Sequence, residues 1–214
     1  MAKTVISGIR KQAERASSAE ALLDATAQIL SEITTIDVSL SEISRRSGVN
    51  SAMIKYHFGN KEGLLLALLE RDADHTMDAL NALVAMEWSA KRKLTVHIQG
   101  IISTYYRSPY LNRLIHYLVE SGSSNASGRV TEIFIKPMIE AYSSIIAQGV
   151  EEGTIREIHP GLLYYALVGA ADHIFHASYS VPAILGVPAL NDDIKRQFSD
   201  FLVDVFLKGL EPTQ

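Results

Sequence analysis

Apolar side chains recur along this chain every three or four residues, which is the spacing of one face of an α-helix. In the segment 18–33 the apolar positions are Leu22, Ala25, Ile29, Leu30 and Ile33. They fall on one stripe of a helix. Ser17 and Glu20 have the spacing of a capping box, so we expect the first helix to begin there. No strand pattern is found, and the sequence predicts an all-α protein.

A short helix, a glycine turn and a second short helix follow. Ser39 and Glu42 repeat the capping-box spacing and open a helix that ends before Gly48. Asn50 can cap the next helix, which runs over 51–57 and ends at Gly59. Because glycine reaches the positive φ of a tight reversal, the two helices can form a helix-turn-helix. Its expected core is Leu40, Ile43, Val49, Ile54 and Phe58.

From Lys61 onward the pattern predicts one long helix, with apolar positions from Leu64 to Leu83, and then further helices. We expect the further helices at about 90–107, 109–122, 128–152, 160–179 and 191–209. Pro137 should kink its helix because proline lacks a backbone N–H. The Ser- and Gly-rich run at 121–128 predicts a mobile loop. The total is about nine helices, divided into domains 1–60 and 61–214.

Charge is spread unevenly along the chain. The net charge is −4, but residues 1–61 carry eight basic and six acidic residues, which leaves −6 for the rest. This split indicates an N-terminal module for a polyanion, although chance could also produce it. The chain has no cysteine. With no signal-peptide pattern and no apolar run near the roughly 20 residues of a membrane span, we expect a cytoplasmic protein without membrane contact.

The second short helix is the candidate DNA-reading element, since in a helix-turn-helix the later helix enters the major groove. Its candidate base-reading residues are Ser51, Ala52, Met53 and Lys55. Candidate phosphate contacts are Ser41, Tyr56, His57, Asn60 and Lys61. Cations and helix N-termini both attract phosphate oxygens. The alternative is a helical hairpin whose basic residues form an ordinary solvated surface.

The segment from Val38 to Leu65, VSLSEISRRSGVNSAMIKYHFGNKEGLL, resembles the DNA-binding module of the TetR (tetracycline-repressor-like) family. The matching features are Gly48-Val49, Tyr56-His57-Phe58, Asn60-Lys61 and Leu64-Leu65. Ala52 and Lys55 differ from the residues that are common in that family, so base specificity cannot be carried over. The resemblance implies an N-terminal three-helix helix-turn-helix DNA-binding domain and a C-terminal helical ligand-binding and dimerisation domain.

The helices at 160–179 and 191–209 combine a wide apolar stripe with small residues. We interpret them as half of a four-helix dimer interface, as the family resemblance also implies. The expected interface residues are Ala166, Ala170, Phe198, Phe201, Leu202 and Val205. Core packing within one chain is the alternative. A two-fold dimer would place two recognition helices one DNA turn apart and read a palindromic site.

The body also carries tyrosines and histidines that can line a ligand pocket with apolar walls and a few polar groups. The candidates are Tyr105, Tyr142, Tyr165, His173 and His176. The pattern Asp172-His173-x-x-His176 could suggest a metal or acid/base site. Asp172 and His176, four positions apart, are more simply interpreted as a helix pair, and since no further ligand is evident, no metal or cofactor is expected.

No catalytic constellation is recognisable in the sequence, which argues against an enzyme. We therefore expect a homodimeric transcriptional regulator, most simply a repressor, that binds double-stranded DNA. A small, mostly apolar or aromatic effector would release it. A helical enzyme and an effector-independent DNA-binding protein are the alternatives.

Overall fold

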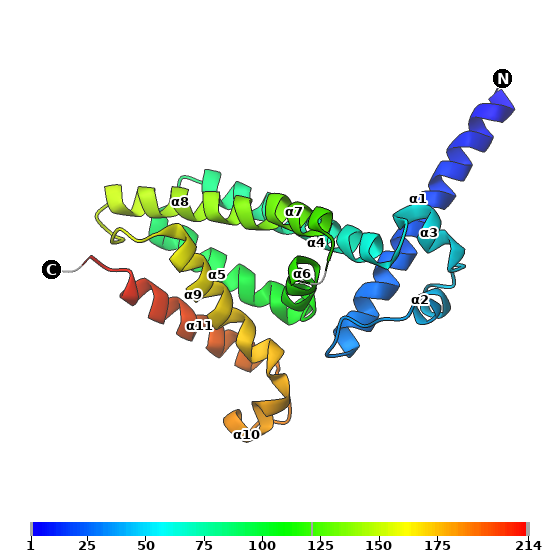
Figure 1. Cartoon of the computed structure of the whole chain (residues 1–214). Coiled ribbons are helices and arrows are strands. Elements are labelled where there is room, and N and C mark those ends of the chain that lie inside the picture. Colours follow the sequence, from blue (N-terminus) through cyan, green and yellow to red (C-terminus); the bar gives the residue numbers. More distant parts are fainter. Residues whose placement is uncertain (1, 121, 213–214) are drawn as a thin grey trace. The chain divides into compact units, whose positions relative to one another are not determined.

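The chain is helical, and no strand occurs in the part that the structure describes (Figure 1). The structure, a computed structural model, describes residues 2–120 and 122–212, with side chains from residue 16 onward. The basic residues Lys3, Arg10, Lys11 and Arg15 therefore lie outside the described side chains. The all-α fold class is confirmed. The chain divides into two compact units, one formed by residues 1–72 and 113–130 and the other by residues 73–112 and 131–214.

The first unit contains the helix-turn-helix. Its helices are α1 (Ala2–Glu32), α2 (Leu40–Ser47), α3 (Ala52–Phe58), the first half of α4 (Lys61–Ala85), most of α6 (Leu111–Glu120) and α7 (Ser124–Val130). Ser39 caps α2 as predicted, because its Oγ accepts from the Glu42 N–H at 3.2 Å. Gly48 follows α2 with φ 69°, a left-handed conformation that makes the predicted turn.

The junction between α3 and α4 also depends on its local sequence. Asn60 Oδ1 accepts from the Gly63 N–H at 2.8 Å and so caps α4. A Cβ atom on Gly63 would lie 2.0 Å from the carbonyl oxygen of Phe58. Glycine therefore allows the end of α3 to approach the first turn of α4 closely.

The core of the helix-turn-helix contains fewer buried residues than the sequence predicts. Ile43 and Ile54 are buried against α1, where the predicted stripe is buried except for the half-exposed Ile33. Leu40, predicted in this core, is 38% exposed. Val49 and Phe58 are half-buried. Leu40 lies at the first position of α2, where its side chain need not follow the inward face.

Helices α6 and α7 belong to the first unit through polar contacts with α1 and α4. The Arg113 guanidinium donates to the carbonyl oxygens of Leu30 and Ile33, at 3.0 and 2.8 Å, and so caps the end of α1. Ser123 donates from its N–H and its hydroxyl to the Glu62 carboxylate, at 2.8 and 2.7 Å. These hydrogen bonds lower the pKa of Glu62. The predicted boundary at residue 60 stays a prediction.

The second unit is a layered helical body. It contains the end of α4, α5 (Ala90–Arg107), the π-helical turn η1 (Thr131–Ile135), α8 (Lys136–Glu151), α9 (Pro160–His176), the 3-10 turn η2 (Ser178–Ser180), α10 (Val181–Leu185) and α11 (Asp192–Gly209). α5 packs against α8, α9 and α11, and α8 packs against α9. Figure 1 shows α10 at the far end of α9, where the chain turns back into α11.

Three boundary predictions were wrong, each because wider context overrides a local signal. Ser17 lies inside α1 and does not start it, since residues 10–16, RKQAERA, are strong helix formers. The run 121–128 contains the start of α7, because Ser123 Oγ accepts from the Ala126 N–H and Ala126 is buried. The gap between the helices expected at 160–179 and 191–209 contains α10, because Pro182 stands in its first turn, where proline is compatible with a helix.

Pro137 produces a different effect from the predicted kink within one helix. The helix expected over 128–152 is divided among α7, η1 and α8. Proline stands in the first turn of α8, where an N–H is not needed, and the π-helical turn lies directly before it.

Candidate nucleic-acid interface and ligand cavity

Helix α3 exposes the residues that the sequence predicts to read bases. Ser51, Ala52 and Lys55 are exposed and Met53 is half-buried, whereas Ile54 is buried on the opposite side. Asn50 Oδ1 accepts from the Ala52 N–H at 2.8 Å and holds the start of the helix. The burial of Ile54 therefore orients α3 so that its polar face is open to solvent.

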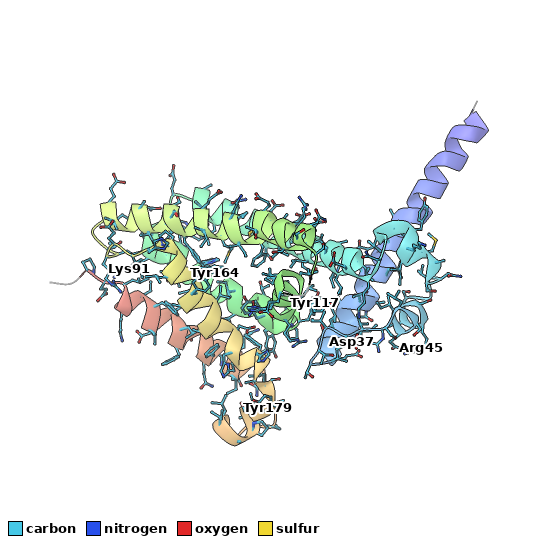
Figure 2. All side chains as sticks on the ribbon, viewed as in Figure 1. Asp37, Arg45, Lys91, Tyr117, Tyr164 and Tyr179 are labelled. Atoms are coloured by element: carbon cyan, nitrogen blue, oxygen red, sulfur yellow. The ribbon has the colours of Figure 1, made fainter. Side chains whose placement is uncertain are left out.

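The cations near α3 differ in how far they are already neutralised. Arg45 donates to both carboxylate oxygens of Glu42 at 2.8 and 2.7 Å, and these hydrogen bonds lower the pKa of Glu42. Lys61 Nζ lies 3.0 Å from Asp37 Oδ1. Figure 2 labels Arg45 and Asp37 in this part of the chain. Among the described side chains, Lys55 has no ion-pair partner, so its charge is fully available to a polyanion.

His57 is held by the fold rather than projecting freely. Its Nε2 shares a hydrogen bond of 2.9 Å with Ser18 Oγ of α1, and its ring contacts the rings of Tyr56 and Phe58. Ser41, exposed on α2, shares a hydrogen bond with Ser39. The Asn60 side-chain oxygen is used in the cap of α4, whereas Tyr56 is 57% exposed. Phosphate contacts by these residues stay predictions.

A cavity of about 360 Å³ lies within the second unit, between α4 and α5. Lys93 Nζ of α5 donates to the carbonyl oxygen of Val84 near the end of α4 at 2.7 Å, so the two helices run antiparallel from the hairpin that joins them. Buried Leu80, Ile101, Tyr105 and Met138 line the inner wall. The volume and the largely apolar lining are those of a small-molecule site.

The cavity changes in character along its length. At the hairpin end its wall consists of Leu83, Met86, Trp88 and Val96. The polar lining residues His75, Thr76, Ser103, Thr104 and Arg107 lie towards the other end, beside the apolar Leu111. His75 and Met86 are eleven positions apart. At the rise per residue of an α-helix, the cavity therefore extends about 16 Å along α4.

A buried hydrogen-bonded pair forms the middle of the cavity wall. His97 lines the cavity, and its Nε2 shares a hydrogen bond of 2.9 Å with the hydroxyl of Tyr142, which lies behind it and is fully buried. Burial lowers the pKa of His97 to about 4. The imidazole is therefore neutral near pH 7 and presents a polar but uncharged surface to a ligand.

This pKa predicts a pH dependence of stability. The unfolded chain binds a proton at His97 below about pH 6.5, whereas the folded chain does so only below about pH 4. The contribution of neutral His97 to the free energy of unfolding is therefore complete above about pH 6.5. It is lost as the pH falls towards 4, by about 3 kcal/mol in total. Urea unfolding at several pH values measures this loss. Relative to its own stability at neutral pH, the His97→Gln variant should lose less unfolding free energy on acidification than the wild type does. His116→Gln, at an exposed histidine, should keep the wild-type loss.

Family models match both parts of the chain. The model described as "Tetracyclin repressor-like, C-terminal domain" matches residues 87–214, which is more than half of the chain. The model described as "Bacterial regulatory proteins, tetR family" matches residues 22–68, which include the whole helix-turn-helix. The chain belongs to the TetR family. Members of this family are transcriptional regulators and not enzymes, so the helical-enzyme alternative is not favoured.

Curated TetR-family relatives match the N-terminal part of the chain. The HTH-type transcriptional regulator BetI of Escherichia coli O127:H6 is 36% identical over 81 residues, which are 37% of this chain and 42% of BetI. BetI of Escherichia coli O17:K52:H18 is 35% identical over the same length. The matched stretch thus spans less than half the length of these relatives.

Solved structures show the same fold over nearly the whole chain. FadR from Bacillus subtilis in complex with stearoyl-CoA has a TM-score of 0.70 at 18% identity, covering 90% of this chain and 99% of FadR. AibR in complex with isovaleryl coenzyme A and operator DNA has a TM-score of 0.70 at 18% identity, covering 88% of this chain and 97% of AibR. At these identities the likeness concerns the fold alone.

Only some of the predicted ligand residues lie at the cavity between α4 and α5. Tyr105 lines it, and Tyr142 lies one layer behind, bonded to His97. Tyr165, His173 and His176 are exposed on α9 and do not line it. The helical register of α9 turns these three side chains to solvent while Leu163, Leu167 and Ala171 face inward.

An apolar outer face covers α9 and α11. Leu162, Tyr165, Phe201 and Val205 are 62%, 76%, 61% and 46% exposed. Of the predicted interface residues, Ala166, Phe201 and Val205 are exposed. Ala170 and Phe198 are half-buried, and Leu202 is buried within the unit. Leu202 thus belongs to the inner face of α11. Tyr179, which Figure 2 labels near α10, and Ile184 of α10 are also exposed.

Several cavity residues were missed by the sequence analysis, above all His75, His97, Thr104 and Arg107. One signal was present: His97 lies on the apolar stripe of α5 between Leu94 and Ile101. A polar residue on a buried stripe needs a partner or a cavity. The pairing with Tyr142, 45 positions later in the chain, is not encoded in local spacing.

Proposed function

We propose that this TetR-family protein is a cytoplasmic homodimeric repressor that binds a palindromic operator and is released by a small molecule in the α4–α5 cavity. One observation carries the proposal: a helix-turn-helix with an exposed α3 occurs in the same chain as an apolar cavity with a few polar groups. DNA binding without an effector would leave such a cavity without a role.

Dimerisation is supported by the apolar face of α9 and α11. Large exposed apolar patches mark association surfaces in otherwise well-packed proteins. A two-fold dimer formed through this face would bury Leu162, Tyr165 and Phe201, the most exposed apolar side chains of the two helices. Two copies of α3 could then read two half-sites of one operator.

Effector control is supported by the position of α4 in the sequence. Its residues 61–72 belong to the unit that holds the helix-turn-helix, and its residues 73–85 to the unit that holds the cavity. Leu80 and Leu83 of α4 line the cavity. A ligand with different affinities for two α4 orientations would shift the DNA-binding equilibrium, typically by about 1–3 kcal/mol. FadR was solved in complex with stearoyl-CoA, and AibR in complex with isovaleryl coenzyme A and operator DNA.

A mobility-shift experiment tests the proposal. The full-length protein should retard the DNA upstream of its own gene at nanomolar concentration, and a scrambled duplex should require a far higher concentration. A ligand that occupies the cavity should weaken the specific complex about 5–150-fold. Operator binding that no cavity ligand alters would leave an effector-independent DNA-binding protein.

The Lys61–Asp37 pair gives a matched test of phosphate contact. Lys61→Ala should weaken binding to all duplexes alike and reduce the salt slope by about one, because a phosphate contact carries no base information. Asp37→Ala should instead strengthen binding, since it removes the carboxylate 3.0 Å from Lys61. Fluorescence anisotropy over a salt series measures both effects. Unchanged affinity and slope in the lysine variant would place Lys61 outside the interface.

A further inference from the structure

The α4–α5 cavity has an uncompensated positive end. Arg107 is exposed in the last turn of α5, its Nε donates to the carbonyl oxygen of Ser103 at 3.3 Å, and it has no ion-pair partner among the described residues. Thr104 and His75 lie at the same end. No aspartate or glutamate occurs among the described residues that line the cavity. Asp74 and Asp78 flank His75 along α4, but they lie outside the lining.

The opposite end has no charged residue in its wall, which Leu83, Met86, Trp88 and Val96 form. The guanidinium of Arg92 stacks on the ring of Trp88, 3.9 Å from its centroid, but Arg92 does not line the cavity. A charged group placed inside this end would therefore lose its hydration without a counter-ion in the wall. The middle contains His97, which is neutral near pH 7 because burial lowers its pKa, and no charged residue. The cavity therefore has an apolar half, an uncharged middle and a cationic mouth.

We propose that the effector site takes an amphipathic molecule with an extended apolar chain and a single anionic head group. The head group lies at Arg107 and Thr104, and the chain points towards Trp88. This inference rests on the proposed function, whose site it deepens by naming the ligand chemistry and its orientation. A free carboxylate and a chain conjugated to a phosphate-bearing carrier share this chemistry.

The lining argues against two other ligand classes. A cationic ligand would meet Arg107 and would find no carboxylate in the wall, so its charge would be opposed rather than paired. A neutral apolar ligand would fill the hairpin end but leave the guanidinium of Arg107 and the hydroxyl of Thr104 without a ligand partner. An anionic head group satisfies both, since charge-assisted hydrogen bonds are stronger than neutral ones.

Trp88 makes the site directly observable. The chain has one tryptophan, and it stands in the cavity wall at the hairpin end. Its emission in the full-length protein therefore reports occupancy of this end. Decanoate, decanol and decyltrimethylammonium share one chain length and differ in head-group charge, so they form a matched set of probes.

Decanoate should bind about tenfold more tightly than decanol, which is about 1.4 kcal/mol, and decyltrimethylammonium should bind more weakly than either. Arg107→Gln should reduce decanoate affinity about tenfold and change decanol affinity less than twofold. Arg196→Gln removes the same charge from an exposed pair with Asp193 on α11, outside this cavity, and should change neither affinity. Equal binding of decanoate and decanol, or an unaffected Arg107→Gln variant, would overturn the anionic head group.

Orientation requires a second measurement. A dodecanoate with bromine at its methyl end should quench Trp88 strongly, whereas one with bromine beside the carboxylate should quench it weakly, because bromine quenches at contact range. The reverse order would overturn the proposed direction. A coenzyme A thioester of the same chain, compared with the free acid, distinguishes the two sources of the anionic group.

Failure of this inference is separable from failure of the proposed function. If decanol releases the operator as readily as decanoate does, the proposed repressor function is supported, but the proposed anionic head group is contradicted. Decanoate binding with the expected dependence on Arg107, but with unchanged operator affinity, supports the site and contradicts the release mechanism. Absence of any change in Trp88 emission with decanoate overturns the inference, whatever the DNA-binding result.

Discussion

A variant that carries both Leu162→Glu and Phe201→Glu is expected to be a folded monomer that no longer binds the operator. Both side chains are more than 60% exposed in the isolated chain, so the substitutions should change its folding stability by no more than about 0.5 kcal/mol. In the proposed dimer each carboxylate would be buried without a partner, which costs several kcal/mol. The two-fold axis doubles this cost, because the same residues occur in both copies.

Sedimentation velocity at micromolar concentration measures the monomer, and circular dichroism verifies its helical content. Val150→Glu is the matched control, since Val150 is an exposed apolar residue of α8 outside the proposed interface. The control should remain dimeric and bind DNA normally. A dimeric double variant would place the interface on another surface and leave the α9–α11 face unexplained.

A second large effect is expected from Lys55→Glu, which should weaken operator binding at least about a hundredfold at physiological salt. Lys55 is exposed on the recognition helix and its ammonium is not neutralised by a described carboxylate. Reversing its charge removes an attraction to DNA and adds a repulsion in the groove, and a hundredfold loss corresponds to about 2.7 kcal/mol. Lys136→Glu reverses the charge of an exposed lysine of α8 and should leave DNA binding intact.

Anisotropy titrations with the operator and with a scrambled duplex show which role Lys55 plays. A loss confined to the operator indicates a contact to a base edge, whereas an equal loss on both duplexes indicates a phosphate contact. Wild-type affinity of the variant for both duplexes would contradict the orientation of α3 towards DNA.

The helix-turn-helix was predictable from the sequence because its determinants are local. Ser39, Gly48 and Asn60 act on backbone groups within three residues, through caps and a left-handed turn. The same reasoning failed at Ser17 and at the 121–128 run. There a cap signal or a polar composition was outweighed by continuous helix propensity, or by the burial of Ala126.

The ligand candidates illustrate the opposite case. Tyr105 and Tyr165 are the same residue type on apolar-rich helices, yet one is 4% and the other 76% exposed. The difference arises from the helices that cover them, since α5 is enclosed by α8, α9 and α11, whereas α9 keeps an outer face. Sequence spacing tells which residues share a face of a helix, but not which neighbouring helix that face meets.

The sequence by itself determined the all-α class, the helix-turn-helix with its caps and turn, and the family. These depend on interactions between residues close in the chain, whose geometry is set by the backbone. Tertiary structure alone decided the cavity, with its apolar end at Trp88 and its cationic end at Arg107, and the burial of Leu202 beside the exposure of Phe201. A cavity is the volume left between helices after packing, so its lining joins residues up to 63 positions apart, from His75 to Met138, and depends on their relative placement in space.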